Sequence, residues 1–286
     1  MVLYNNLLIV IVTYNPDDSF LLLVAEALKM ATKVVIVDNG SSNIELIEKN
    51  LPQEKSLLLY KSQRNRGIGW GLNQGIRLGR FEGVKWILTF DQDSFPCENY
   101  LDYYNYVINR ENKRIGLISA NYATNLPDFY GNMKITYHSD LSLITSGMLH
   151  NIEVFNEIGF YNEKMFIDYV DFEYVLRANL KGFATYKIEN IILSHHLGIP
   201  LFRKLGFWTI YSTNHSPIRR YYKARNHIFV TKQYIRNFPC FIIKKNIYFI
   251  ITIFQILLVD TEKNDKLKMI IRGIKDGLFD RLGSYD

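Results

Sequence analysis

The sequence predicts an α/β domain built on a mostly parallel sheet with helices on both faces, followed by a helical C-terminal extension. Two observations predict the sheet: apolar runs rich in Val, Ile and Leu recur through the first ninety residues, and segments with helical spacing separate them. Continuous apolar strands that alternate with helices are typical of parallel sheets buried on both faces. The 286 residues, 48% of them hydrophobic, are enough for one large domain with an appendage.

Four apolar runs give the expected strands in chain order, at residues 7–12, 34–37, 56–60 and 86–90. Residues 19–31 carry apolar side chains at helical spacing, so a helix is expected between the first two strands. The cluster from Asp38 to Ser42, which reads Asp-Asn-Gly-Ser-Ser, follows the second run and is typical of a tight turn.

The N-terminus and the cysteines exclude several classes of protein. The first residues contain a short apolar run but no basic region and no small-residue cleavage site, so they read as a buried strand rather than a signal peptide. Neither Cys97 nor Cys240 lies in a CxxC pattern, so a zinc site or a disulfide framework is not supported. This cysteine usage fits a reducing compartment.

Glycine recurs at every fourth position after the third expected strand, at residues 67, 71, 75 and 79. On a helix these positions lie close to one face, and each glycine costs about 1 kcal/mol relative to alanine. Close approach of the sheet beneath the helix is one explanation, and a ligand phosphate near its N-terminus is the other. The pattern is not a dinucleotide fingerprint, because Leu72 stands where GxGxxG requires glycine.

Polar clusters follow three of the expected strands, at the edge where open α/β sheets bind ligands. They are Thr13-Tyr14-Asn15, Asp38-Asn39 and Asp91-Gln92-Asp93. Two carboxylates at i and i+2 outside a buried strand can present to one Mg²⁺, which fills its remaining positions with water and substrate phosphates. A metal held in this way would neutralise a diphosphate leaving group.

A second acidic cluster lies within residues 166–173. Asp168 and Asp171 are three residues apart and would share a helical face if this segment is helical. Carboxylates among apolar neighbours suit a general base, while the alternative is a charge arrangement that favours the helix dipole. His195 and His196 follow another apolar run and are either metal ligands or a surface pair.

Eight motifs occur in order: Val12-Thr-Tyr-Asn15, Val37-Asp-Asn-Gly-Ser-Ser42, Asn65-Arg-Gly67, Asp91-Gln-Asp93, Thr145-Ser-Gly147, Phe166-Ile-Asp-Tyr-Val-Asp-Phe-Glu-Tyr-Val-Leu-Arg177, His195-His196 and Ser216-Pro-Ile-Arg-Arg-Tyr-Tyr-Lys-Ala-Arg-Asn226. Their order and spacing resemble family 2 glycosyltransferases, and within them the bacterial rhamnosyltransferase branch. The resemblance runs from about residue 7 to about residue 230. It implies the GT-A fold, with a Rossmann-like sheet.

The resemblance also implies a sugar-nucleotide site. Thr13, Asn15 and Asp38 would hold the base and ribose, and Arg66 and Gly67 would lie near the nucleotide.

By the same resemblance, the metal would be Mg²⁺ or Mn²⁺. Asp91 would contact the ribose or the metal, and Asp93 would ligate the metal. His195 or His196 would complete the metal shell, and the sequence does not choose between the two.

The resemblance places catalysis in the second acidic cluster. Asp171 matches the catalytic base and Asp168 its acidic neighbour, although many relatives have Glu-Asp where this chain has Val170 before Asp171. Ser146-Gly147 would line the donor-sugar or acceptor region. The implied activity is inverting transfer of a sugar, expected to be L-rhamnose from dTDP-L-rhamnose, to a lipid-linked oligosaccharide in O-antigen or capsule synthesis. A UDP-sugar donor is the alternative.

Charge divides the chain into an expected catalytic domain at residues 1–200 and a basic, aromatic-rich helical region at 201–286. The second region holds 16 Lys and Arg against 6 Asp and Glu, and no acidic residue lies between Glu189 and Asp260. Such a block suggests an anionic partner, with a solvated basic face as the alternative. Residues 241–259 fit a helix lying on the cytoplasmic membrane surface, with a core helix or a dimer contact as the alternatives.

Two rival functions explain fewer residues. A nucleotidyltransferase would show a basic, Gly-rich first turn, whereas this chain has Thr-Tyr-Asn-Pro at residues 13–16. A nucleic-acid-binding module would account for the basic, Tyr-rich segment 203–236 but not for the two carboxylate clusters. No nucleic-acid partner is therefore predicted.

Overall fold

The computed structural model describes residues 3, 5–80, 83–97, 99–123, 135–195, 201–205 and 208–285. The chain divides into two compact units. The first comprises Met1–Asn162 and Tyr174–His196, and the second comprises Glu163–Glu173 and Leu197–Asp286. The segment 163–173, which the sequence analysis placed in the catalytic domain, clusters with the C-terminal unit.

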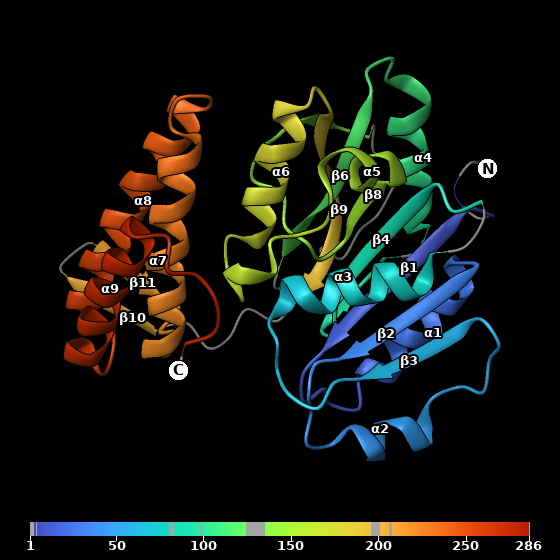
Figure 1. Cartoon of the computed structure of the whole chain (residues 1–286), viewed down its shortest axis with the longest axis horizontal. Helices are drawn as coiled ribbons and strands as arrows, with labels where there is room; N and C mark the ends of the chain where they lie inside the picture. The colour runs from blue at the N-terminus through green and yellow to red at the C-terminus, as the bar shows by residue number, and fades with distance from the viewer. Residues whose placement is uncertain are drawn as a thin grey trace. The chain divides into compact units, whose positions relative to one another are not determined.

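A nine-stranded mixed sheet forms the centre of the first unit (Figure 1). Its order is β3-β2-β1-β4-β8-β6-β9-β5, and β7 pairs with β9. The strands β3, β2, β1 and β4 are parallel, β8 is antiparallel to β4 and β6, and β5 and β7 are antiparallel to β9. The bounds are β1 Leu7–Thr13, β2 Lys33–Asp38, β3 Leu57–Lys61, β4 Trp86–Asp91, β5 Ser94–Phe95, β6 Ile115–Ala123, β7 Tyr137–Ser139, β8 Met148–Asn151 and β9 Ala184–His195.

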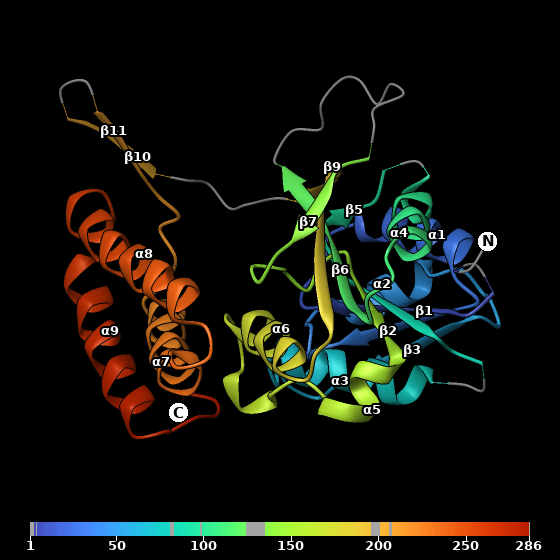
Figure 2. The same cartoon turned by 90° about the horizontal axis from the view of Figure 1, so that it is seen from above.

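Helices cover both faces of this sheet (Figure 2), which confirms the predicted layers. All seven residues of β1 are buried, so its odd-numbered and even-numbered side chains face different layers. The odd-numbered side chains join a core cluster that includes residues of α1 and α4, and α3 packs against the other face. The helices of this unit are α1 Phe20–Met30, α2 Ile44–Asn50, α3 Ile68–Gly79, α4 Tyr100–Arg110 and α5 Ile152–Ile158, and α6 Val170–Leu180 continues into it from the second unit.

The glycine stripe of α3 packs against the sheet. A Cβ atom added at any of three glycines would lie within 3 Å of a side chain of β1. Four helical residues advance about 6 Å and two strand residues about 6.6 Å, so successive glycines meet alternate strand residues. The pairs are Gly71 with Val12, Gly75 with Val10 and Gly79 with Leu8. Helix–sheet packing, one of the two explanations left open, therefore accounts for these three positions.

Among its described residues from 201 onward, the second unit combines three α-helices with a pair of antiparallel strands that was not predicted from the sequence. The strands β10 Leu201–Leu205 and β11 Trp208–Ser212 are antiparallel. The helices are α7 Pro217–Tyr234, α8 Pro239–Leu258 and α9 Lys263–Leu278, and they confirm the predicted helical extension. Gly273 and Gly277 of α9 face backbone atoms of α7, which allows these two helices to pack closely.

Helix α8 is mostly exposed. Among the described residues, α8 is a helix that is long enough and apolar enough to cross a membrane. The mean hydropathy of its most apolar stretch is 1.7, and 11% of that stretch is buried. Its 20 residues, Pro239–Leu258, include nearly all of the segment 241–259 considered from the sequence. Burial this low argues against a core helix, which was one of the alternatives for residues 241–259.

Candidate active site

The turn after β2 is organised by Asp38. Its carboxylate is buried, with 1% of the residue exposed, and accepts hydrogen bonds from the backbone N–H groups of Gly40 and Ser41 at 3.2 and 3.1 Å. The hydroxyl of Ser41 also donates to it. Thr13, the register partner of Asp38 on β1, donates from Oγ1 at 3.3 Å. Two of the predicted nucleotide-binding residues are therefore in direct contact.

Asn15 joins the turns after β1 and β2. Its backbone is left-handed, with φ 49°, which asparagine adopts more readily than most residues. Its N–H donates to Ser41 Oγ at 2.7 Å, and the N–H and hydroxyl of Ser42 donate to its Oδ1 at 2.9 and 3.1 Å. The neighbouring Tyr14 N–H donates to Gln92 Oε1 at 2.6 Å, so the turn after β4 is tied to the same edge.

Asn39 shapes the approach to α3, a role that the sequence analysis did not assign. Its side chain is buried and donates from Nδ2 to Asn65 Oδ1 at 3.1 Å and to the Gly67 carbonyl at 3.2 Å, while its Oδ1 accepts from the Arg66 N–H at 2.9 Å. Gly67 has φ 88°, which favours glycine. The Arg66 guanidinium lies 4.6 Å above the ring of Trp70. The predicted Arg66 and Gly67 thus directly precede α3.

Ser146 and Gly147 directly precede β8 and lie beside the end of β4, with which β8 pairs. The Asp91 N–H donates to Ser146 Oγ at 3.1 Å, and Ser146 Oγ donates to Ser94 Oγ at 2.6 Å. Gly147 has φ 68°, and its N–H donates to the Thr89 carbonyl at 2.7 Å. The structure therefore brings the predicted donor-sugar region together with Asp91.

The backbones of two predicted metal ligands, Asp93 and His195, lie near each other where β5 pairs with β9. Asp93 directly precedes β5, and the antiparallel register sets the backbone of His195 opposite Ser94. His196 lies outside the described residues. Among the residues that the structure describes, no group of three or more His, Cys, Asp or Glu side chains converges as a metal cage. Two carboxylates at this edge still fit a magnesium-type site, because such sites take further ligands from water and substrate phosphates.

The second acidic cluster differs from its prediction. Helix α6 begins at Val170, so Asp168 lies ahead of it with a left-handed backbone of φ 62°, and a helical face shared with Asp171 is wrong. Asp168 accepts two hydrogen bonds from Arg219, from Nε at 3.1 Å and from Nη2 at 3.3 Å, and Lys223 Nζ lies 3.9 Å away. Asp171 lies in the first turn, where the Phe172 N–H donates to its Oδ1 at 2.8 Å.

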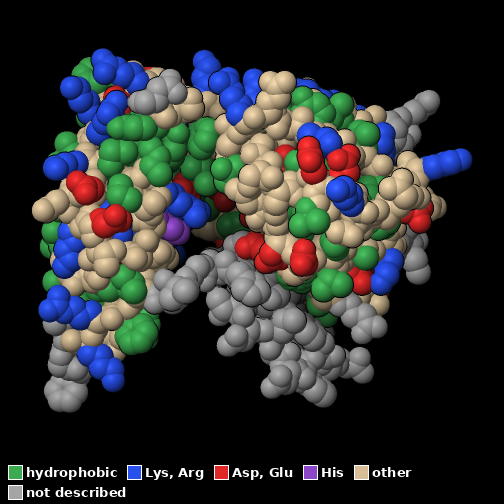
Figure 3. All heavy atoms as spheres, turned by 90° about the horizontal axis from the view of Figure 1, so that it is seen from below, with side chains coloured by type: hydrophobic (Ala, Val, Ile, Leu, Met, Phe, Trp, Pro, Cys, Tyr) green, Lys and Arg blue, Asp and Glu red, His purple; other side chains and the backbone are tan. Residues whose placement is uncertain are grey.

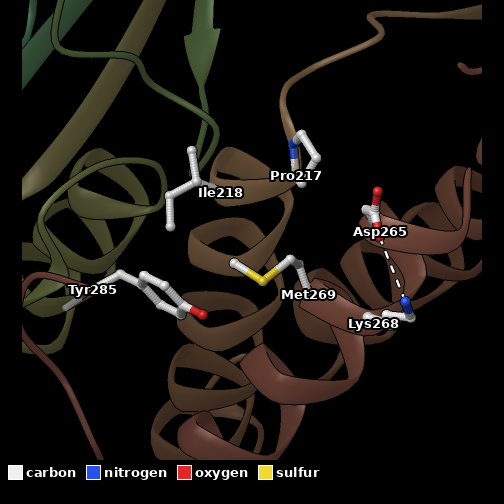
Figure 4. A pocket seen from close by; sticks show the side chains of 6 residues that line it. All are labelled: Pro217, Ile218, Asp265, Lys268, Met269 and Tyr285. Atoms are coloured by element: carbon white, nitrogen blue, oxygen red, sulfur yellow. Dashed lines mark ion pairs between the residues drawn. The ribbon is translucent and has the colours of Figure 1, made fainter. Parts of the chain in front are cut away.

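A pocket of about 590 Å³ in the second unit offers a different environment (Figure 4). It is lined by Pro217, Ile218, Asp265, Lys268, Met269 and Tyr285. The carboxylate of Asp265 lies 3.6 Å from Lys268 Nζ, so the charges on its wall form an ion pair. The rest of the lining is largely apolar and contains none of the predicted site residues.

Two comparisons of sequence identify the family. Residues 8–128 match the family model for glycosyl transferase family 2. The chain is also 30% identical over 300 residues to the dTDP-rhamnosyl transferase RfbF of Shigella flexneri, a match that covers 96% of each chain. The chain belongs to the family 2 glycosyltransferases. The resemblance read from its eight motifs is confirmed, and the protein is a glycosyltransferase.

Solved structures confirm the fold of this glycosyltransferase. Residues 1–349 of S. aureus TarS, crystallised in complex with UDP-GlcNAc, match 96% of this chain and 73% of that one, with a TM-score of 0.51 and 14% identity. The same TarS segment in another crystal structure gives a TM-score of 0.50 at 13% identity, over 96% and 72% of the two chains. The likeness shows the predicted GT-A fold.

Proposed function

We propose that this glycosyltransferase transfers L-rhamnose from dTDP-L-rhamnose, with inversion at the anomeric carbon, to a lipid-linked oligosaccharide in the synthesis of O-antigen or capsule. The donor is inferred from the 30% identity to a dTDP-rhamnosyl transferase over 96% of both chains. Three strand-end turns linked by hydrogen bonds support a nucleotide site in the first unit.

The first unit supplies the donor-binding groups. Thr13, Asn15 and Asp38 form one hydrogen-bonded edge and are assigned to the nucleoside. Asp91 and Asp93, with His195 or His196, are assigned to Mg²⁺ or Mn²⁺, which when bound would neutralise the charge of the departing diphosphate. The remaining assignments are Arg66 and Gly67 near the nucleotide, and Ser146 and Gly147 in the donor-sugar or acceptor region.

Asp171 is assigned as the general base. Asp168 is engaged by the Arg219 guanidinium in a two-bond ion pair, so both of its carboxylate oxygens already accept hydrogen bonds. Asp171 takes the proton from the acceptor hydroxyl while that oxygen forms a bond to the anomeric carbon. The bond from this carbon to the diphosphate breaks on the opposite face, and the electron pair leaves with the diphosphate. A single displacement of this kind inverts the configuration.

The donor assignment is tested by titration calorimetry of the whole protein with dTDP and with UDP, each with and without Mg²⁺ or Mn²⁺. We expect dTDP to bind more tightly than UDP, and only when metal is present. The variant Asp93→Asn should lose the effect of metal, because one of the two proposed carboxylate ligands is removed. Tighter binding of UDP would indicate a UDP-sugar donor in place of dTDP-L-rhamnose. Binding that does not depend on metal would contradict the metal assignment.

We further propose that the enzyme is a cytoplasmic protein attached to the inner face of the membrane through α8. Exposed apolar side chains follow one stripe of this helix at helical spacing, while the opposite stripe packs against α7 and α9. The stripe consists of Ile243, Ile247, Tyr248, Ile250, Ile251, Phe254, Leu257 and Leu258.

Basic side chains accompany this apolar stripe. Lys244 is exposed on α8, and the exposed Arg203 and Lys204 lie on β10, whose Arg203 donates to the Leu258 carbonyl at 2.9 Å. Figure 3 draws one face of the molecule, on which hydrophobic, basic and acidic side chains all reach the surface. An apolar face with basic neighbours fits an anionic leaflet, where the helix lies in the interface rather than across the bilayer.

Vesicle co-sedimentation tests this attachment. We expect the protein to bind anionic vesicles, to bind neutral vesicles weakly and to dissociate as salt rises. The double change Ile250→Glu with Phe254→Glu should weaken binding at least about 10-fold, because two apolar side chains are lost from the interface. Ile271→Glu, at an exposed position of α9, is the matched control. Unchanged binding of the double variant, or concentration-dependent dimerisation lost in it, would instead make the stripe a dimer contact.

A further inference from the structure

Apart from the ion pair of Arg219 with Asp168, the motif Ser216–Asn226 has no role in the chemistry proposed above, yet its side chains make specific contacts within the second unit. It occupies the first part of α7. Four of its side chains, or neighbours of it, lie close together on the surface of the helix: Arg219, Tyr222, Asn226 and His227. Successive members are three, four and one residues apart. All four contact the short loop Phe166–Tyr169, which directly precedes α6 and its Asp171.

This loop has an unfavourable backbone. Phe166, Asp168 and Tyr169 have φ values of 65°, 62° and 66°, and none of them is glycine. A left-handed conformation is unfavourable for such residues, and it persists only where surrounding contacts impose it. Three such residues within four positions therefore require strong contacts from another element.

Asn226 provides contacts to the loop backbone. The residue is fully buried, and its Nδ2 lies 2.8 Å from each of three carbonyl oxygens, those of Met165, Ile167 and Asp168. Its Oδ1 accepts from Arg225 Nε at 3.0 Å, which fixes the direction of the amide. The Met165 carbonyl also accepts from the Ile167 N–H at 2.8 Å and from Arg225 Nη2 at 2.9 Å, so Asn226 and Arg225 together hold the backbone that leads into the loop.

The side chains of the three left-handed residues are also held by α7. Arg219 forms the two hydrogen bonds to Asp168 described above. The ring of Phe166 stacks on Tyr222, with centroids 4.8 Å apart and an interplanar angle of 15°.

The third left-handed residue, Tyr169, is held by His227. Its hydroxyl lies 2.9 Å from His227 Nδ1, and His227 Nε2 lies 2.8 Å from Asn246 Oδ1. An imidazole that donates from Nε2 to this amide oxygen accepts the Tyr169 hydroxyl at Nδ1. Burial lowers the pKa of His227 to about 4, which keeps the ring neutral for this arrangement.

We propose that this face of α7 is a clamp that imposes the left-handed conformation on residues 166–169 and thereby sets the direction in which Asp171 enters α6. Asn226 and Arg219 are positioning residues, since they act through the loop rather than on the reacting atoms. The inference rests on the proposed function, in which Asp171 is the base. A displacement of a catalytic group by about 1 Å costs on the order of 10²-fold in rate, so a loosened clamp should lower kcat.

The test compares four variants of the full chain in rhamnosyl transfer from dTDP-L-rhamnose to extracted lipid-linked oligosaccharide. Asn226→Ala should lower kcat about 100-fold, and Arg219→Gln about 10-fold, while KM for the donor and the affinity for dTDP stay unchanged. Arg219→Lys should recover part of the loss, because lysine keeps the charge but not the two-bond fork. Lys232→Gln removes an exposed ion pair with Asp280 from the same helix and should leave kcat unchanged.

Hydrogen exchange of the amides at 165–169 is measured on the same variants, because a clamp predicts faster exchange there while the rest of the fold stays protected. If Asn226→Ala does not fold, the test rests on Arg219→Gln and Arg219→Lys, for which kcat and hydrogen exchange are measured in the same way. Wild-type kcat and wild-type exchange in folded Arg219→Gln would overturn the clamp. Asp171→Asn is assayed beside them: full activity in that variant would refute the proposed base, whereas its inactivity beside fully active clamp variants would refute the clamp alone.

Discussion

Replacing Asp171 by asparagine is expected to lower kcat for rhamnosyl transfer by about 10²–10⁴-fold, the usual contribution of a positioned general base. Asparagine keeps the size of the side chain and can still accept from the Phe172 N–H, but it does not take up a proton at neutral pH. Because the donor groups lie on other elements, the affinity for dTDP should be unchanged. Initial rates and calorimetry on the same protein preparation measure the two quantities.

A matched control separates catalysis from helix electrostatics. Asp102 lies in the first turn of α4, as Asp171 does in α6, and removing either charge weakens a favourable interaction with the helix dipole by about 0.3–1 kcal/mol. Asp102→Asn should therefore reproduce the small effect on stability without the loss of kcat. Equal kcat in the two variants would mean that Asp171 is not the base. The second acidic cluster would then be explained by its alternative, a charge arrangement that favours the helix dipole.

The variant Asp260→Asn should lose about 3–5 kcal/mol of unfolding free energy, the largest effect on stability that we expect in the second unit. Asp260 Oδ2 lies 3.0 Å from Arg220 Nη2 and 3.1 Å from Lys266 Nζ, and the three side chains are at most 3% exposed. Neutralising this carboxylate removes the counter-charge that pairs with both buried cations. Urea unfolding, followed by circular dichroism, measures the loss.

An exposed ion pair of the same unit provides the control for this prediction. Asp280 lies 2.9 Å from Lys232 Nζ, with side chains 60% and 39% exposed, so Asp280→Asn should cost less than about 1 kcal/mol. A cost for Asp260→Asn no larger than that of Asp280→Asn would contradict the account of the buried cluster.

The same cluster predicts how stability depends on pH. Burial disfavours the charged form of Asp260, but hydrogen bonds from Ser212 and Lys266 and the nearby charge of Arg220 outweigh it and lower the pKa of this carboxyl. A carboxyl with a lowered folded pKa stabilises the protein above its unfolded pKa of about 3.9, and this contribution disappears as pH falls through the folded pKa.

The strands of the first unit and the polar edge of its sheet could be predicted from local sequence patterns. The four apolar runs are β1 to β4, because a buried parallel strand needs apolar side chains on both faces and that need is visible in the sequence. Polar residues directly after three of those strands lie at one edge, since parallel strands end on the same side. The hydrogen bonds from Thr13 to Asp38 and from Tyr14 to Gln92 realise that arrangement.

Long-range contacts explain what the sequence did not predict. Asp168 pairs with Arg219, which lies 51 residues further along the chain, and Asn226 contacts the left-handed loop from a similar distance in sequence. Neither feature can be predicted from a local sequence pattern. The motif that contains Arg219 and Asn226 was visible, but its role required the fold. Asn39 is another example, because its partners Asn65 and Gly67 lie 26 and 28 residues further along the chain.

The central claim, single displacement from a sugar nucleotide, is tested most directly by following the turnover of dTDP-L-rhamnose by proton NMR in the presence of Mg²⁺ and extracted lipid-linked oligosaccharide. The account predicts release of dTDP together with a product whose anomeric configuration is opposite to that of the donor from the first time points, and no turnover by Asp171→Asn. A product that first appears with the configuration of the donor would contradict single displacement by Asp171.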